Sequence, residues 1–324
     1  MEKIRWGILA TGQIANKMAD ALGHIPDAEL VAVGSRSEER GRDFAARHGI
    51  PKVHGSYEAL AADPQVDIVY VATPHPFHRD ASVLCMQAGK AVVCEKPFAV
   101  NCCQASDMVR TAREKKVFLM EAMWTRFLPA IQKLKQLVAD HAVGQCRMLE
   151  ADFGFRSERN PQGRLFAPEL AGGALLDVGV YPISLDSFLF GPPSRIATLA
   201  DIGPTGIDEQ NAVILGHDGG PLSVLVSAVR TTTRHEAVVL GTQGKITVHN
   251  FWTASGLIVT RGDKEEVIEL PIDGNGFEYE AKEAMRLMRA GKTESPEMPL
   301  DETLSIMKTM DRIRDQWGLK YPCE

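Results

Sequence analysis

Short apolar runs alternate with amphipathic stretches over the first 122 residues. The apolar runs are rich in β-branched residues and hydrophobic on both faces, which predicts strands of a parallel sheet covered on both sides. We expect these strands at 4–9, 29–35, 66–72, 91–94 and 117–122. Helices are expected between them, at 12–22, 37–48, 76–89 and 102–116. This alternation predicts an α/β domain over residues 1–122.

The pattern changes after residue 122. Between residues 195 and 270, strand signals follow one another with turn residues between them and no helices, which predicts a largely antiparallel sheet. A strand is also expected at 146–155, and helices are expected at 128–141, 181–190, 277–289 and 300–316. We therefore expect a second α/β domain over residues 123–324.

Composition excludes several classes of protein. The chain has 324 residues, 44% hydrophobic and 24% charged, the profile of a soluble globular protein. Its net charge of −6 argues against nucleic-acid or membrane partners, and we expect no apolar run of the roughly 18 residues that span a bilayer. Six cysteines without a C-x-x-C pair, and no signal peptide, predict a cytoplasmic protein with reduced thiols. No metal site is expected, because the His75 and His78 pair lacks further ligands.

The turn after the first strand has the pattern A-x-G-x-x-A. Gly12 lets the backbone approach a pyrophosphate at a helix N-terminus, and the small Ala15 lets that helix lie against the strand. The turn therefore predicts a dinucleotide-binding (Rossmann-type) domain, with an ordinary strand-to-helix turn as the alternative. The expected contacts to the cofactor are Ala10, Thr11, Gly12, Gln13 and Ile14.

The end of the second strand distinguishes between cofactors. A carboxylate there would bind the ribose 2′-hydroxyl of NAD, but this chain has Ser35 and Arg36, with Arg40 one helical turn further. Arg36 can pair with a 2′-phosphate and Ser35 can donate a hydrogen bond to it. The sequence therefore favours NADP over NAD, and a solvated arginine is the alternative.

The tripeptides T-P-H and E-K-P, which begin at Thr73 and Glu95, follow the third and fourth expected strands. They lie at the sheet edge where open α/β sheets bind ligands. A lysine directly after a buried strand can bind a substrate hydroxyl or the nicotinamide ribose, or it can simply pair with Glu95. The expected cofactor contacts at this edge are Thr73, Pro74, His75, His78, Glu95 and Lys96.

The segment G-G-A-L-L-D-V-G-V-Y-P carries Asp177 and Tyr181, one helical turn apart. A tyrosine transfers protons usefully only where a cation stabilises its phenolate, and Lys96 would supply one. The alternative is a core aromatic residue.

These motifs, with T-P-H-x-x-H, C-E-K-P and E-A-M-W-T-R-F in the same order, make the chain resemble the Gfo/Idh/MocA oxidoreductases over almost its whole length. It is most similar to the branch of dimeric dihydrodiol dehydrogenases and NADP-dependent D-xylose dehydrogenases. The resemblance implies an open, mainly antiparallel second sheet, which often forms a homodimer. It also implies hydride transfer between NADP(H) and a sugar or cyclic diol, and often a cis bond before Pro97.

The resemblance also assigns roles to residues. Lys96 and Tyr181 match the catalytic positions, although many relatives have histidine in place of Tyr181. The positions matching the substrate side are Asp177, Trp124, Arg126 and Phe127. In this interpretation Tyr181 accepts the hydroxyl proton, Lys96 orients the oxygen, and hydride passes to the nicotinamide.

Two other functions remain open from the sequence. The same residues could reduce deoxyosones or anhydro-sugars, because proton and hydride return along the same path. An NADP-sensing regulator without turnover is the second alternative, although such a protein would not need both Lys96 and Tyr181. The sequence does not identify the substrate.

Overall fold

The computed structural model describes residues 2–324 and divides them into two compact units. The first unit contains the chain up to Trp124 together with Asp273–Leu304, and the second contains Thr125–Ile272 and Ser305–Glu324. We expected one division at residue 122, with everything after it in the second domain. The structure returns residues 273–304 to the first unit, because α8 (Phe277–Arg289) packs on the first helix of that unit.

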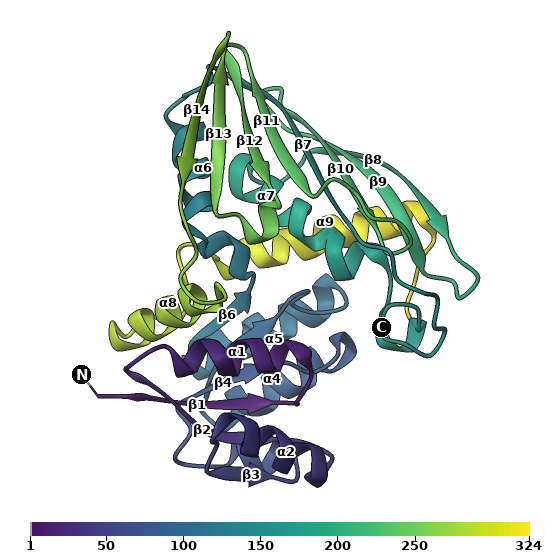
Figure 1. The fold of residues 1–324 in the computed structure, drawn as a ribbon. Coiled ribbons are helices and arrows are strands. Elements are labelled where there is room, and N and C mark those ends of the chain that lie inside the picture. Colours follow the sequence, from purple (N-terminus) through teal and green to yellow (C-terminus); the bar gives the residue numbers. More distant parts are fainter. Residues whose placement is uncertain (1) are drawn as a thin grey trace. The chain divides into compact units, whose positions relative to one another are not determined.

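The first unit is built on a six-stranded parallel sheet with the order β3-β2-β1-β4-β5-β6 (Figure 1). Its strands are β1 (Ile4–Leu9), β2 (Ala28–Gly34), β3 (Lys52–His54), β4 (Ile68–Val71), β5 (Ala91–Glu95) and β6 (Leu119–Ala122). Its other helices are α1 (Gln13–Gly23), α2 (Glu38–His48), α3 (Tyr57–Ala61), α4 (His78–Gln87) and α5 (Cys102–Lys115). All five predicted strands and four predicted helices are present. The sequence missed only the short β3 and α3.

The strand order reverses direction between β1 and β4. From β1 the chain moves outward to β2 and β3, then returns to the other side of β1 with β4. The loops after these two strands therefore diverge at one edge of the sheet. Such a switch point is where open α/β sheets bind their ligands.

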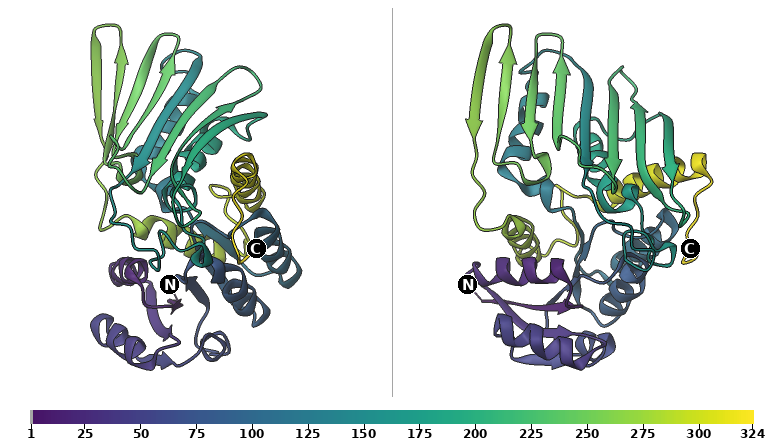
Figure 2. Two further views of the ribbon diagram at one scale, coloured as in Figure 1. Left: turned by 90° about the vertical axis from the view of Figure 1, so that its right-hand side faces the viewer. Right: turned by 45° about the vertical axis from the view of Figure 1, so that its right-hand side comes forward.

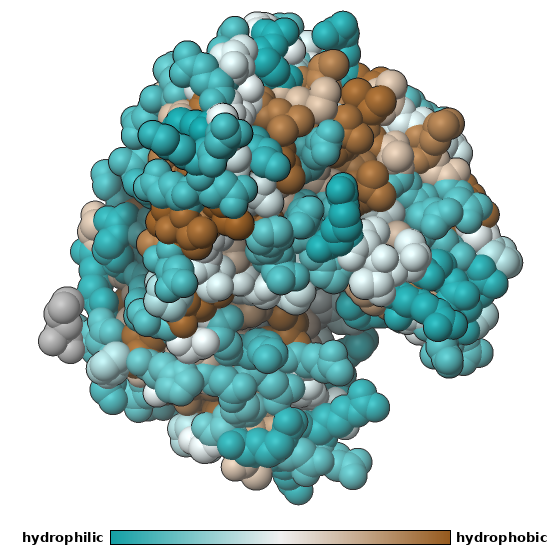
Figure 3. Space-filling model, turned by 45° about the horizontal axis from the view of Figure 1, so that its top comes forward, coloured by the Kyte–Doolittle hydropathy of each residue, from teal (hydrophilic) through white to brown (hydrophobic). Residues whose placement is uncertain are grey.

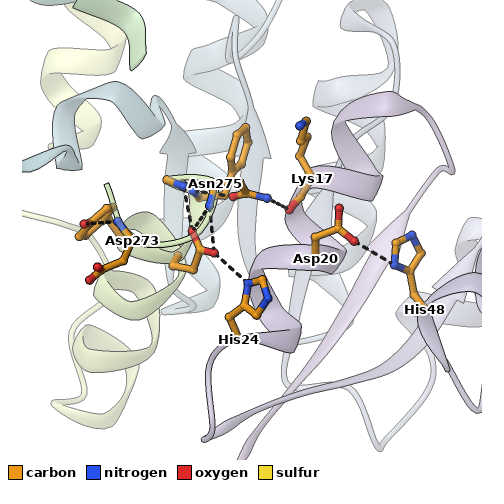
Figure 4. Close-up of polar contacts among 10 residues, drawn as sticks. Lys17, Asp20, His24, His48, Asp273 and Asn275 are labelled. Carbon is orange, nitrogen blue, oxygen red and sulfur yellow. Dashed lines mark hydrogen bonds and ion pairs between the residues drawn. The ribbon is translucent and has the colours of Figure 1, made fainter. Parts of the chain in front are cut away.

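Polar contacts explain why α8 belongs to the first unit (Figure 4). The Asn275 side chain donates to the Lys17 carbonyl of α1 at 2.8 Å, and the buried Glu278 carboxylate faces His24 Nδ1 at 3.3 Å. Glu278 also accepts from the backbone N–H of Asn275 and Gly276, which closes the turn that begins α8. The turn that begins α8 therefore makes hydrogen bonds both to α1 and within itself.

The second unit contains an eight-stranded sheet with the order β14-β13-β12-β11-β7-β10-β9-β8. The strands are β7 (Cys146–Gly154), β8 (Arg195–Ile202), β9 (Asp208–Gly216), β10 (Leu222–Ala228), β11 (Glu236–Gly241), β12 (Gly244–His249), β13 (Gly256–Arg261) and β14 (Lys264–Glu269). Only the β7–β10 pair is parallel, so the sheet is mainly antiparallel, as predicted.

Helices cover one face of this sheet. The helices α6 (Pro129–Ala139) and α7 (Val180–Phe190) contact it, and α9 (Leu300–Trp317) ends in this unit. Both views in Figure 2 show the opposite face without a helix in the described part of the chain. The sheet is therefore open on one side.

One apolar segment is longer than we expected. Residues Pro168–Phe190 are long and apolar enough to cross a bilayer, contrary to our expectation that no run reaches that length. The segment is 83% buried inside the structure, and every α7 residue from Val180 to Phe188 is buried. A helix surrounded on all sides needs no polar face, so its composition reflects a core position.

Candidate active site

The N-terminus of α1 is left open for an anion. Ser37, Ser56 and Asn101 cap α2, α3 and α5 with side-chain oxygens. Helix α1 begins after Gly12 with no side-chain cap and no acidic residue in its first turn, whereas α4 and α8, which also lack a side-chain cap, have acidic residues in their first turns. A Cβ built on Gly12 would meet nothing within 4 Å. The free N–H groups, the helix dipole and the open space before Gly12 fit a pyrophosphate.

Ala10, at the first position of the motif, has left-handed backbone geometry. Its φ is 77°, and its N–H donates to the Gly34 carbonyl at 2.9 Å. The turn therefore requires the conformation that glycine usually supplies in this motif. An alanine held there costs about 1–2 kcal/mol. The departure from the glycine pattern changes the residue but keeps the turn.

We expect Ala10→Gly to raise the free energy of unfolding by about 0.5–1 kcal/mol, because relief of the strain exceeds the added entropy of the unfolded chain. Thermal or urea unfolding measures this change. Ala15→Gly is the matched control, since Ala15 is buried inside α1 and its loss should destabilise by about 1 kcal/mol or more. Equal destabilisation by both variants would show that Ala10 is not strained.

The loop after β4 provides the other side of the switch point. The Thr73 hydroxyl is buried and has no hydrogen-bond partner among residues 2–324. An unpaired buried hydroxyl is costly, so Thr73 is suited to a ligand that completes its hydrogen bonding. His75, two residues further along the same loop, is also buried. The structure thus supplies an orphaned polar atom at the predicted cofactor edge.

His78, which we expect among the cofactor contacts, also bridges two loops at this edge. Its ring nitrogens lie 2.7 Å from the Thr73 carbonyl and 2.9 Å from the Pro97 carbonyl. It therefore joins the loops that follow β4 and β5. Burial lowers the pKa of His78, while the two carbonyls that its ring nitrogens face oppose this shift.

Glu95 fixes the backbone at Lys96. Its carboxylate accepts from the Tyr70 hydroxyl and, at 3.1 Å, from the backbone N–H of Lys96. The Lys96–Pro97 peptide bond is cis, as the resemblance implies. Glu280, on α8, is fully buried near Glu95, and burial followed by the charge of Glu95 raises its pKa well above the ordinary value. Glu95 is therefore the carboxyl group that orders this loop, and its charge contributes to the raised pKa of Glu280.

Arg36 lies against two aromatic residues that the sequence did not predict. Its guanidinium carbon is 5.1 Å from the centroid of the half-exposed Phe77 ring. Tyr57 is also close to Arg36: burial raises the pKa of Tyr57, and the charge of Arg36 opposes that rise. The Ser35 hydroxyl accepts from the Ser37 N–H at 3.2 Å, which leaves its proton free to donate. Arg40 stands exposed in the first turn of α2.

In the second unit, a π-helical turn at Leu175–Gly179 leads directly into α7. The buried Asp177 carboxylate in this turn pairs with Arg164 at 2.5 Å. Tyr181 lies in the first turn of α7, with its ring 5.3 Å from that of Phe153. Asp177 and Tyr181 therefore lie in consecutive helical turns. Arg164 comes from a loop whose conformation the sequence did not indicate.

An aromatic cluster surrounds Phe153, beside Tyr181. Phe153 stacks on Trp252 at 4.9 Å and packs edge-on against His235 at 5.2 Å and Phe251 at 6.5 Å. The sequence separates these residues by up to about a hundred positions, so only the sheet brings them together. Phe153 and Phe251 are buried, so this cluster forms part of the core beside Tyr181.

Residues 124–127 themselves are placed differently. Trp124 stacks on Phe277 at 4.8 Å in the first unit. Arg126 is only 1% exposed, and its guanidinium donates to the Ser184 hydroxyl and carbonyl while it lies 4.7 Å from the Phe188 ring. Phe127 is buried as well. Arg126 thus has structural contacts within its own unit, which favours a packing role over the expected contact with substrate.

The residues of the first unit fit a dinucleotide. The open α1 N-terminus, the orphaned Thr73 hydroxyl and the Ser35–Arg36 pair follow three neighbouring strands of one sheet edge. Among residues 2–324 there is no group of three or more histidine, cysteine, aspartate or glutamate side chains that could hold a metal ion. All six cysteines are free thiols, of which Cys85 and Cys94 are buried.

Family models match both parts of the chain. Residues 4–123 match the oxidoreductase family with an NAD-binding Rossmann fold, and residues 131–247 match the GFO/IDH/MocA C-terminal domain. The chain therefore belongs to the GFO/IDH/MocA oxidoreductase family. It is an enzyme of the nicotinamide-dependent oxidoreductase class, as the motifs predicted.

Relatives match over the full length. Trans-1,2-dihydrobenzene-1,2-diol dehydrogenase of Xenopus tropicalis is 36% identical, covering 98% of this chain and 99% of the relative. The human enzyme of the same name is 37% identical, with 98% of each chain covered. Among solved structures, the 3-ketoreductase KijD10 from Actinomadura kijaniata has a TM-score of 0.88 at 24% identity, with 97% and 98% covered. Aldose-aldose oxidoreductase from Caulobacter crescentus has a TM-score of 0.89 at 23% identity, with 98% of each chain covered. These two structures share the fold.

Proposed function

We propose that the protein is an NADP-linked dehydrogenase of secondary alcohols on a ring, acting on a cyclic vicinal diol or a sugar. The full-length relatives at 36–37% identity carry the diol dehydrogenase name, and this observation carries the proposal. The aromatic cluster around Phe153, on the same unit as Tyr181, suits a flat or weakly polar ring. The six free thiols fit the proposed cytoplasmic location.

In the proposed mechanism Tyr181 accepts the proton of the substrate hydroxyl. Lys96 orients that oxygen and favours the tyrosinate through its positive charge. Asp177, held by Arg164, orients a second substrate hydroxyl. The bound nicotinamide supplies the hydride-accepting carbon. In the reverse direction Tyr181 returns the proton to the alkoxide.

NADP preference is proposed from the first unit. Arg36 lies against Phe77 and close to Tyr57, so less conformational entropy is lost when its guanidinium binds a 2′-phosphate. No acidic residue occupies the end of β2, where a carboxylate would repel that phosphate. Initial rates with both cofactors, in both directions, on cyclic diols, D-xylose and other aldoses test the proposal. Turnover of the diol or an aldose with NADP supports it, and binding without turnover would favour a sensor.

We further propose a homodimer through the open sheet face of the second unit. One row of side chains crosses all eight strands on this face, and its register is set by successive strand pairs. The row contains Ala197, Ile214, Val224, Glu150, Val238, Thr247, Ile258 and Val267. Leu199 is 81% exposed, Val267 64% and Ile214 47%. Figure 3 shows apolar surface gathered over this part of the molecule. An apolar area of this kind is a liability in a monomer and fits a second copy.

We expect sedimentation of the wild-type protein at micromolar concentration to show a dimer. Ile214→Glu combined with Val224→Glu should yield monomers, because each charge would be buried without a partner at the interface. Asp140→Lys, exposed at the end of α6, is the control and should remain dimeric. A wild-type monomer, or a dimer unaffected by the double substitution, would reject this face.

A further inference from the structure

Asp208, the first residue of β9, binds the start of the segment that carries Asp177 and Tyr181. Its carboxylate oxygen Oδ2 accepts from the Leu175 backbone N–H at 2.7 Å and from the Asn211 side chain at 2.8 Å. Leu175 begins the π-helical turn, which has no other side-chain cap. Asp208 is completely buried. One carboxyl group thus accepts a backbone N–H at the start of the segment.

The glycine pair before this turn is shaped around the same carboxyl group. Gly173 has φ 122°, and a Cβ on it would lie 2.2 Å from Asp208 Oδ1. The same Cβ would lie 3.3 Å from the buried Tyr321 hydroxyl, which donates to the Gly172 carbonyl at 2.7 Å. The absence of a side chain at Gly173 therefore lets the chain lie directly against Asp208 and Tyr321. The chain therefore enters the segment with Asp177 and Tyr181 through a close-fitted anchor.

The second oxygen of Asp208 has no partner. Oδ1 makes no hydrogen bond within residues 2–324. Burial raises the pKa of Asp208 to about 7, although the Leu175 and Asn211 donors and the charge of Arg314 oppose the rise. Besides Arg314, the titratable group facing Asp208 is Tyr321, whose own pKa is raised well above the ordinary value, mainly by burial. The carboxyl group therefore changes charge near neutral pH while its neighbours do not.

We propose that Asp208 is a positioning residue that sets the geometry of Tyr181 through the Leu175 N–H, and that its protonation state controls how tightly the segment is held. A proton on Oδ1 leaves both hydrogen bonds to Oδ2 intact but neutral. Ionisation makes both bonds charge-assisted and adds attraction to the helix N-terminus. The inference that this affects turnover rests on the proposed role of Tyr181.

Amide hydrogen exchange of the segment 172–181, measured from pH 6 to 8, tests the anchor without any substrate. Asp208→Ala should raise exchange at Leu175 about tenfold or more, as expected for loss of a hydrogen bond to a charged group. Asp208→Asn keeps an acceptor oxygen and should retain most of the protection, but lose its dependence on pH. Glu209→Gln is the control: Glu209 is also buried on β9, but it pairs with Arg159 and should leave the segment unchanged.

The pH profile of kcat provides the second readout. The kcat of the wild-type enzyme should change with pH around pH 7, and Asp208→Asn should remove this change. KM for NADP should be the same in both proteins. The melting temperature should fall as pH rises from about 4 to 7, because ionising a carboxyl group with a raised folded-state pKa removes stability, and Asp208→Asn should abolish this part of the fall. An Asp208→Asn enzyme with the wild-type exchange and kcat profiles would overturn the inference, even if Asp208→Ala does not fold.

The two proposals fail in different ways. If Asp208 controls exchange of the segment but no alcohol is oxidised, the anchor stands and the proposed function fails. If Tyr181→Phe lowers kcat while the Asp208 variants change neither exchange nor the pH profile, the proposed function stands and the anchor fails.

Discussion

Tyr181→Phe is expected to lower kcat by about 10²–10⁴-fold while NADP affinity stays almost unchanged. The substitution removes only the hydroxyl group, so the packing of the ring on Phe153 is retained. Because Tyr181 is the proposed proton acceptor, the loss should appear in the chemical step and not in cofactor binding. Pre-steady-state formation of reduced cofactor, together with fluorescence titration of NADPH, measures both quantities.

Lys96→Met should reduce kcat at least as much, because it removes both a substrate contact and the charge that favours the tyrosinate. The double variant should be little worse than the worse single variant, since the two residues act as a unit. Tyr279→Phe is the control: it removes a tyrosine hydroxyl that accepts from the Asp273 backbone N–H, and it should not reproduce the loss of chemistry. If Tyr181→Phe retains more than about a tenth of wild-type kcat, proton transfer belongs to another group, with Asp177 or His75 next to be tested.

Arg36→Ala should weaken NADP binding about tenfold to a hundredfold and leave NAD nearly unchanged. The expected loss is roughly 1.5–3 kcal/mol, that of a charge-assisted contact to the 2′-phosphate. Calorimetric titration with NADP, NAD and 2′,5′-ADP separates this contact from the pyrophosphate site. Phe77→Ala should give a smaller loss in the same direction, because it releases the guanidinium without removing it.

Arg40→Ala is the control, since Arg40 is equally charged and exposed on the next helical turn. A similar loss for NADP and NAD in Arg36→Ala would show that Arg36 supports the fold. A loss confined to Arg40→Ala would move the phosphate contact onto α2.

The strands and helices of the first unit could be predicted because the sequence signals for each element lie within that element or next to it. Runs such as Ile68–Val71 are buried throughout, and Ser37 caps α2 as its position before two acidic residues suggested. The return of α8 to that unit could not be predicted. It depends on Asn275 and Glu278 reaching Lys17 and His24, which lie more than two hundred residues away along the chain.

The residues of the candidate site also form two groups: those that the sequence places, and those that only the fold brings close. Gly12, Ser35 and Lys96 follow strands directly, so strand prediction alone places them at the sheet edge. Their supporting residues are non-local. Phe77 lies in the 3₁₀ turn after β4 and Tyr57 begins α3, yet both are close to Arg36, while Arg164 and Asp208 reach the Tyr181 segment from a loop and a strand. Residue type gave no signal for them, because an exposed phenylalanine or an aspartate at a strand end is common.

The Arg126 result shows the limit of motif-based assignment. Its motif places it beside Trp124 and Phe127 in the sequence, yet its guanidinium binds Ser184 and lies over Phe188 in the second unit. A buried arginine needs several acceptors, and α7 provides them. Close spacing in a motif therefore did not predict a shared role.

The most direct test of the proposed function follows a label from substrate to cofactor. A trans-dihydrodiol or an aldose deuterated at the carbinol carbon is incubated with NADP and wild-type protein, and the reduced cofactor is examined by mass spectrometry and NMR. The account predicts deuterium at C4 of the nicotinamide, formed at least about a hundredfold more slowly by Tyr181→Phe. Tight NADP binding with no deuterium transfer from any diol or aldose would contradict it and identify the protein as a cofactor sensor.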